Sequence, residues 1–206
     1  MLTKIAVMVS GGGTNLQALI DAQQSGIIKN GEIVLVISSK AGVKALERAE
    51  KAGIPHVVCS RKESASAEEF EAKIQHELEK AGAQLIILAG FMSILSSEFV
   101  KKWDKRIINV HPSLIPSFCG EGFYGLRVHE AALAKGVKVT GATVHFVNEI
   151  PDGGEIIFQK AVEVCDGDTP EVLQKRVMEQ AEWKLLPQAA EYVSEKIMKE
   201  GQDYGK

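Results

Sequence analysis

The sequence has few cysteines, no long apolar run and no large excess of either charge. Its three cysteines, Cys59, Cys119 and Cys165, are far apart and form no Cys-x-x-Cys pair, so we expect ordinary thiols in a reducing compartment and no zinc site. No stretch of 18 apolar residues is present to span a bilayer. The net charge of -3 gives no general attraction for nucleic acid. The N-terminus is a short strand-like run ending in glycines rather than a signal peptide, which predicts a cytoplasmic protein without nucleic-acid or membrane partners.

What the sequence does contain is the composition of an ordinary globular domain. Of its 206 residues, 45% are hydrophobic and 25% are charged. A chain of this length can bury about 70% of its unfolded surface as one domain. We therefore expect a single domain over residues 1–206.

Short β-rich runs alternate with stretches of helical character through the first half of the chain. This alternation predicts an α/β fold, a Rossmann-like and mostly parallel sheet with helices on both faces. The expected strands are residues 5–9, 33–37, 56–59, 85–88 and 107–110. Ser66 and Glu69 have the spacing of a capping box before one helix, and Gly53 ends another that begins near Val43.

The pattern changes after residue 137. Two long β-rich runs, 138–148 and 155–164, are joined by residues 149–154, which is short enough for a C-terminal antiparallel hairpin with Asp152 at its tip. Thr169 and Pro170 then begin a final helix. We expect this helix to continue toward Met198 with a kink at Pro187, and residues 201–206 to fray.

A glycine-rich turn, Ser-Gly-Gly-Gly-Thr-Asn at residues 10–15, follows the first strand and precedes a helix. Backbone N–H groups at such a turn can bind an anion, above all phosphate. The turn is not a dinucleotide fingerprint, because position 16 is Leu, and no lysine follows to make a Walker loop. The second strand ends in Ser-Ser-Lys where an NAD site needs an acidic residue, so a monophosphate fits better. The alternative is a tight turn that needs glycine only for a positive φ.

An amide and an imidazole, Asn109 and His111, stand two positions apart at the end of the fifth expected strand. Side chains with this spacing face the same way, and open parallel sheets bind ligands at the carboxyl ends of their strands. Asp152 in the Gly-rich loop can orient or charge the imidazole. For the remaining histidines a structural or solvated role is the simpler interpretation; they are His56, His76, His129 and His145.

The chemistry of this group points to acyl transfer. Asn109 can donate a hydrogen bond to an oxyanion, and His111 can move a proton at neutral pH. No serine or cysteine stands in a recognisable nucleophile motif, so the nucleophile belongs to a substrate. The sequence therefore indicates acyl transfer between two small molecules through a tetrahedral intermediate.

Five segments, in order and spacing, closely resemble the phosphoribosylglycinamide formyltransferases, the folate-dependent transformylases of purine synthesis. They are residues 10–17, 88–92, 109–114, 144–147 and 152–154, and the resemblance extends from Lys4 to about Pro187. It implies a catalytic trio of Asn109, His111 and Asp152. The implied phosphoribosyl contacts are Gly13, Thr14, Asn15 and, on the ribose, Glu182. The implied folate contacts are Met92, Ser93, Ile94, Leu95 and Asn109, with the loop 147–154.

The implied reaction is direct transfer of the formyl group from 10-formyltetrahydrofolate, as co-substrate, to the amine of N1-(5-phosphoribosyl)glycinamide in de novo purine biosynthesis. Asn109 and protonated His111 stabilise the oxyanion, Asp152 keeps His111 charged, and no metal takes part. The resemblance divides the chain into a phosphate-binding half, about residues 1–105, and a catalytic and folate-binding half, about 106–206. We expect a monomer or a homodimer.

The chain departs from the family pattern at three places, two of which concern folate. Ser93 and Ala67 stand where some members have arginine, so folate is expected to be anchored differently. The segment 118–125, with three glycines and three aromatic residues, is longer than in some relatives. It is either a mobile lid or a packed surface loop.

The alternatives to this function come from two classes of protein. Methionyl-tRNA formyltransferase and formyltetrahydrofolate hydrolase share the Asn, His and Asp core. The Gly-Thr-Asn turn, suited to a phosphoribosyl group, and the lack of an added RNA-binding or regulatory domain disfavour both. A non-catalytic sensor of phosphate ligands on the same fold leaves the trio unexplained.

Overall fold

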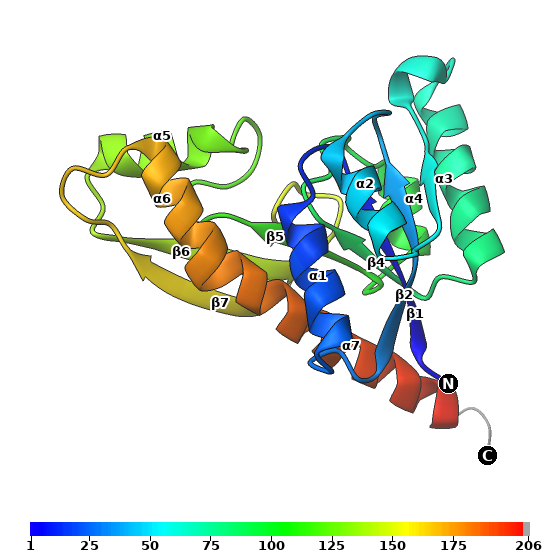
Figure 1. Cartoon of the computed structure of the whole chain (residues 1–206). Coiled ribbons are helices and arrows are strands. Elements are labelled where there is room, and N and C mark those ends of the chain that lie inside the picture. Colours follow the sequence, from blue (N-terminus) through cyan, green and yellow to red (C-terminus); the bar gives the residue numbers. More distant parts are fainter. Residues whose placement is uncertain (204–206) are drawn as a thin grey trace.

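The computed structural model describes residues 1–203, which form one seven-stranded sheet with helices on both faces (Figure 1). The strands are β1 Thr3–Val9, β2 Gly31–Ser38, β3 His56–Val58, β4 Leu85–Leu88, β5 Ile107–His111, β6 Val139–Phe146 and β7 Ile156–Glu163. The helices are α1 Thr14–Gln24, α2 Lys44–Lys51, α3 Ala67–Ala81, α4 Ser97–Lys102, α5 Leu126–Lys135, α6 Pro170–Val177 and α7 Trp183–Asp203. A 3-10 turn lies at Arg61–Glu63 and a π-helical segment at Met178–Glu182.

The strand order is β3-β2-β1-β4-β5-β6-β7. Strands β1 to β5 pair in parallel, whereas β6 is antiparallel to β5 and β7 is antiparallel to β6. The predicted α/β architecture, a mostly parallel sheet with a C-terminal antiparallel hairpin, is confirmed. Among residues 1–203, none of the helices combines the length and apolar character that a membrane span requires.

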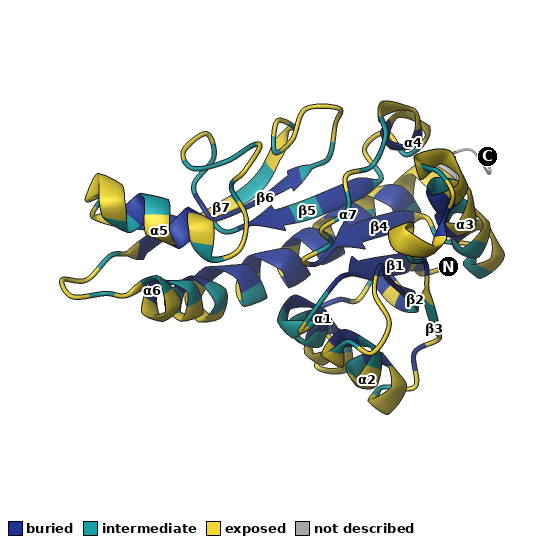
Figure 2. Ribbon diagram, turned by 90° about the horizontal axis from the view of Figure 1, so that it is seen from above, coloured by how far each residue is buried: buried dark blue, intermediate teal, exposed yellow. Residues whose placement is uncertain are grey.

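Each face of the sheet has its own apolar core, because the central strands are hydrophobic on both sides. On β1, Ile5 and Val7 pack with α1, α2 and α7, while Ala6 and Met8 pack with α3 and α4. Figure 2 shows the central strands as buried and the outer faces of the helices as exposed. This two-sided burial fixes where the carboxyl ends of β1, β4 and β5 lie, and the expected site residues are attached to those ends.

The predicted helix signals are confirmed at three helix ends. Ser66 Oγ accepts a hydrogen bond from the N–H of Glu69 at 3.2 Å, and the Glu69 carboxylate accepts from the N–H of Ala65 at 2.7 Å. Gly53, with φ of 69°, follows α2. Thr169 Oγ1 caps α6 by accepting from the N–H of Val172 at 3.3 Å.

The final helix differs from the expected single helix kinked at Pro187. The break comes earlier, at the π-helical segment Met178–Glu182, and Pro187 lies inside α7. A π-helical turn is wider than an α-helical turn and often occurs at functional positions. Helix α7 continues to Asp203, so the expected fraying is wrong for residues 201–203, and residues 204–206 lie outside the described residues.

The hairpin strands are shorter than predicted. Strands β6 and β7 cover 139–146 and 156–163 instead of 138–148 and 155–164, so residues 147–155 form the connecting loop. Asp152 lies in this loop with a positive φ of 55°. A Cβ at Gly154 would lie 1.8 Å from the carbonyl oxygen of Phe146, so the loop must return close to the end of β6 through a residue without a side chain.

We predict that Gly141→Ala destabilises the hairpin. A Cβ at Gly141 on β6 would lie 2.0 Å from the carbonyl oxygen of Lys160 on β7, and a paired backbone cannot easily move away. Overpacking of this kind costs about 1–3 kcal/mol, and thermal unfolding should show a lower Tm. Gly201→Ala in α7 is the control, since its Cβ meets nothing within 4 Å. Equal Tm values for Gly141→Ala and the wild-type protein would contradict the prediction.

Candidate active site

The glycine turn is held by α2. Gly13 caps α1 with φ of 70°, and a Cβ there would lie 2.7 Å from Cα of Ala45, so both conformation and space require glycine. The N–H of Ala45 donates to the carbonyl of Gly11 at 3.1 Å, and Arg48 Nε donates to the carbonyl of Gly12 at 3.0 Å. Arg48 has no signal in the sequence, because only the packing of α2 places it at the turn.

Two of the expected phosphoribosyl contacts meet at the start of α1. Asn15 Nδ2 donates to Glu182 Oε2 at 2.8 Å, although the two residues are 167 positions apart. Glu182 lies in the π-helical segment and is 6% exposed. Burial raises the pKa of Glu182, and the hydrogen bond from Asn15 opposes that shift. Thr14 lies beside this pair as the first residue of α1.

The expected catalytic trio also comes together. Asn109 and His111 lie on β5, and His111 Nδ1 is 3.4 Å from Asp152 Oδ2. The other ring nitrogen, Nε2, is 2.8 Å from the carbonyl oxygen of Phe118. A carbonyl only accepts hydrogen bonds, so Nε2 carries a proton and Nδ1 is the atom that gains or loses one. The exchangeable proton of His111 therefore faces Asp152.

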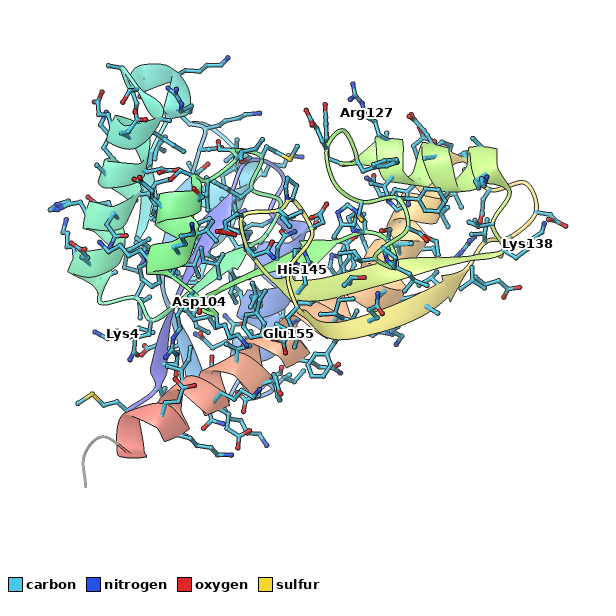
Figure 3. The ribbon with its side chains drawn as sticks, turned by 180° about the vertical axis from the view of Figure 1, so that it is seen from behind. Lys4, Asp104, Arg127, Lys138, His145 and Glu155 are labelled. Carbon is cyan, nitrogen blue, oxygen red and sulfur yellow. The ribbon has the colours of Figure 1, made fainter. Side chains whose placement is uncertain are left out.

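A second imidazole, that of His145, contacts Asp152, although the sequence pattern favours a structural role for this residue. His145 Nε2 is 3.5 Å from Asp152 Oδ1 and 3.3 Å from Asn109 Nδ2. Strand β6 pairs with β5 so that His145 is directly opposite Asn109. Figure 3 shows His145 near the middle of the molecule, where the hairpin meets the parallel strands. Only the register of this pairing reveals the residue's place in the site.

The Asp152 carboxylate is mostly buried but remains ionised at neutral pH. Burial acts to raise its pKa. Its contacts with His145 and His111 and the N–H of Gly120, which donates to Oδ2 at 2.9 Å, act in the opposite direction and lower the pKa below the usual value. The site therefore contains a fixed negative charge beside two imidazoles.

The other histidines lie outside this contact network. His56 and His76 are exposed, as expected. His129 on α5 is fully buried rather than solvated, and burial together with the charge of His111 lowers its pKa to about 4. His129 is therefore neutral at neutral pH.

A cavity of about 170 Å³ opens beside Asn109, His145 and Asp152. Its other lining residues are Leu88, Phe91, Ser93, Ile94, Leu95, Val100 and residues 147–151. Three of the expected folate contacts on the segment 92–95 thus reach the cavity. Met92, His111 and Ala67 are not among the lining residues. The side chain of Met92 is 52% exposed, while its N–H donates to Ser10 Oγ at 2.9 Å and ties this segment to the glycine turn.

A larger cavity of about 550 Å³ lies between α1 and α7 and reaches Thr14 and Arg48. It includes no member of the trio. This cavity is larger than the one beside Asn109, but the ionised carboxylate with its two imidazoles borders the smaller one. The chemistry therefore assigns the candidate active site to the smaller cavity.

The start of the segment 118–125 packs against the trio. Its Phe118 carbonyl and Gly120 N–H contact His111 and Asp152, and the rings of Phe118 and Phe123 meet edge to face at 6.4 Å. This is the arrangement expected of a packed loop. Among residues 1–203, no group of three or more His, Cys, Asp or Glu side chains is placed to hold a metal ion.

We predict that Glu182→Gln stabilises the protein more at about pH 8 than at about pH 4. Burial raises the folded-state pKa of Glu182 above its usual value, so the stability linked to its proton is present at low pH and is lost as the pH rises. Glutamine keeps an oxygen that can accept from Asn15 but cannot ionise. Thermal unfolding at both pH values, with the surface variant Glu179→Gln as control, measures the effect. The same Tm difference at both pH values would contradict it.

Comparison with known proteins agrees with the site. Residues 3–190 match the sequence model of the formyl transferase family. The trifunctional purine biosynthetic protein adenosine-3 of Gallus gallus is 49% identical over 199 residues, which are 97% of this chain but 19% of that protein. The chain thus spans about a fifth or less of the length of the trifunctional relatives that it matches. The phosphoribosylglycinamide formyltransferase of Haemophilus influenzae is 40% identical over 194 residues, 94% of this chain and 88% of that protein.

The fold leads to the same group of proteins. The crystal structure of glycinamide ribonucleotide transformylase 1 from Symbiobacterium toebii superimposes with a TM-score of 0.88 at 38% identity, covering 95% of this chain and 89% of that chain. Sequence, fold and site agree, and the chain belongs to the formyl transferase family.

Proposed function

We propose that the protein transfers the formyl group of 10-formyltetrahydrofolate to the amine of N1-(5-phosphoribosyl)glycinamide, the glycinamide ribonucleotide, in de novo purine biosynthesis. The observation that carries the proposal is the ionised Asp152 carboxylate in contact with His111, beside Asn109 and an open cavity. The names of the Haemophilus influenzae and Symbiobacterium toebii proteins support the choice of acceptor.

Two substrate positions follow from this proposal. The phosphoribosyl group lies at the glycine turn, where the first N–H groups of α1 meet the phosphate and Glu182 meets the ribose. The folate lies in the cavity lined by apolar residues of the segment 92–95 and by the loop 147–152. Each substrate position uses residues from both halves of the sequence. Glu182 lies in the half expected to bind folate but contacts the ribose, and the segment 92–95 lies in the half expected to bind phosphate but lines the folate cavity.

The reaction needs no nucleophile from the protein. The substrate amine attacks the formyl carbon, and its new C–N bond gives a tetrahedral intermediate with a negative oxygen. Asn109 donates to that oxygen, and protonated His111, held charged by Asp152, lies on the same strand to stabilise it. As the bond to the folate nitrogen breaks, the proton lost by the attacking amine passes to that nitrogen through His111 or a water. Holding both substrates in near-attack geometry contributes about 7–11 kcal/mol in favourable cases.

The remaining features of the proposal concern partners and location. We propose a cytoplasmic enzyme whose partners are its two small-molecule substrates, working as a monomer or a homodimer without nucleic acid, membrane or metal. One folded domain over residues 1–206 contains the whole site. Ser93, which lines the folate cavity, contacts the cofactor in place of the arginine found in some relatives.

The test of the proposed function follows both products of one mixture. Purified protein is incubated with glycinamide ribonucleotide and 10-formyltetrahydrofolate, and loss of the formyl folate is compared with appearance of formylated nucleotide. We expect the two to be equal. Loss of formyl folate without formylated nucleotide would contradict the proposal and indicate a hydrolase. Formylation of methionyl-tRNA alone would indicate the tRNA enzyme, and nucleotide binding without turnover a sensor.

We predict that Asp152→Asn lowers kcat by about 10²-fold or more, because the neutral amide no longer holds His111 charged. Nucleotide binding, measured by titration calorimetry, should stay within about twofold, since Asp152 does not touch the glycine turn. Asp166→Asn is the matched control, because the Asp166 side chain is 98% exposed in a surface pair with Lys138. An unchanged kcat for Asp152→Asn would remove Asp152 from the mechanism.

A further inference from the structure

His145 has one ring nitrogen whose protonation is fixed by the backbone. Its Nδ1 is 2.8 Å from the carbonyl oxygen of Phe146. Because that oxygen can only accept a hydrogen bond, Nδ1 carries a proton. The state of the ring is therefore decided at Nε2, which faces the candidate active site.

Two groups compete for His145 Nε2. Asn109 Nδ2 lies at 3.3 Å and Asp152 Oδ1 at 3.5 Å. The amide nitrogen of Asn109 only donates, so this contact is a hydrogen bond only when Nε2 is unprotonated and accepts. A charged His145 would donate Nε2–H to Asp152 and would turn the amide oxygen of Asn109 toward itself. The charge of His145 thus decides which side of the Asn109 amide is anchored.

The charge balance of the site favours a neutral His145. Asp152 supplies one negative charge, and its Oδ2 already faces His111 Nδ1 and the N–H of Gly120. The proposed reaction needs that charge for protonated His111. His145 is 2% exposed, so a second imidazolium would be a second buried positive charge on the one carboxylate that also faces His111. His129, the third buried imidazole, is neutral as well.

We propose that neutral His145 is a positioning residue that accepts a hydrogen bond from Asn109 and so fixes the amide with one N–H on His145 and the other available to the oxyanion. This inference deepens the proposed function and rests on it. Asn109 and His145 both line the cavity, so the second N–H lies where a substrate oxygen can reach it. In this arrangement Asp152 lies beside one charged imidazole, His111, and one neutral imidazole, His145.

The first test needs no substrate. Protein containing 15N-labelled histidine is studied by NMR at the pH of the assay, and His145→Gln identifies the signals of His145. We expect a protonated Nδ1 and an unprotonated Nε2, with the Nε2 signal moving in Asn109→Ala. A protonated Nε2, or a signal that does not respond to Asn109→Ala, would overturn the proposal. Because this measurement requires no turnover, it separates failure of the inference from failure of the proposed function.

The second test is a double-mutant cycle on kcat. Loss of an oxyanion donor costs about 10²-fold, so Asn109→Ala should lose about that much. His145→Leu, which has no acceptor, should lose about 10-fold or more, and the double variant should lose little beyond Asn109→Ala alone. His145→Gln keeps an oxygen acceptor and should recover most of the loss. If the decrease in kcat of the double variant equals the product of the two single decreases, the proposal is overturned.

Two controls distinguish a loss of the hydrogen bond to Asn109 from a general loss of structure. His76→Gln makes the same chemical change at an exposed histidine on α3 and should leave kcat and Tm unchanged. Tm and nucleotide affinity are measured for every variant. If His145→Leu does not fold, His145→Gln and the NMR spectra carry the test, and a His145→Gln protein that folds but is as slow as Asn109→Ala contradicts the proposal.

Discussion

The arrangement of the site depends on one buried negative charge, that of Asp152. A carboxylate that leaves water must be compensated by donors and positive charge, and here these come from separate segments. His111 lies on the last parallel strand, the N–H of Gly120 belongs to the segment 118–125, and His145 on the hairpin contacts the same carboxylate. The same charge therefore holds two loops in place and orders the imidazoles around it.

The second requirement is the reversal of strand direction at β5. Strands β1 to β5 bring their carboxyl ends to one edge of the sheet, which suits substrate binding but offers only residues at strand ends. The antiparallel β6 runs the other way, and its last four residues pair with β5. His145 can therefore lie opposite Asn109 while still being held by backbone on both sides. The hairpin supplies a buried, rigid side chain where a loop would supply a mobile one.

The sequence predicts this protein well wherever the signal is local. Alternating runs indicate the strands, and Ser66 and Thr169 indicate helix starts. Asn109 and His111 could be proposed for one site because they are two residues apart at a strand end, and the structure places Asp152 beside them. The misses depend on pairing and packing. His145 joins the site through strand register, and Arg48 reaches the glycine turn because α2 packs there.

The order β1-β4-β5 has a consequence for how the family can vary. The glycine turn follows β1, the segment 92–95 follows β4, and the reacting groups end β5. Neighbouring strands are about 4.8 Å apart, so the sheet fixes the spacing between these three strand ends. Mutation can lengthen the loops or alter their side chains, but it cannot change this spacing without rebuilding the sheet. The loops and side chains around the site can therefore vary while the spacing between the three strand ends stays the same.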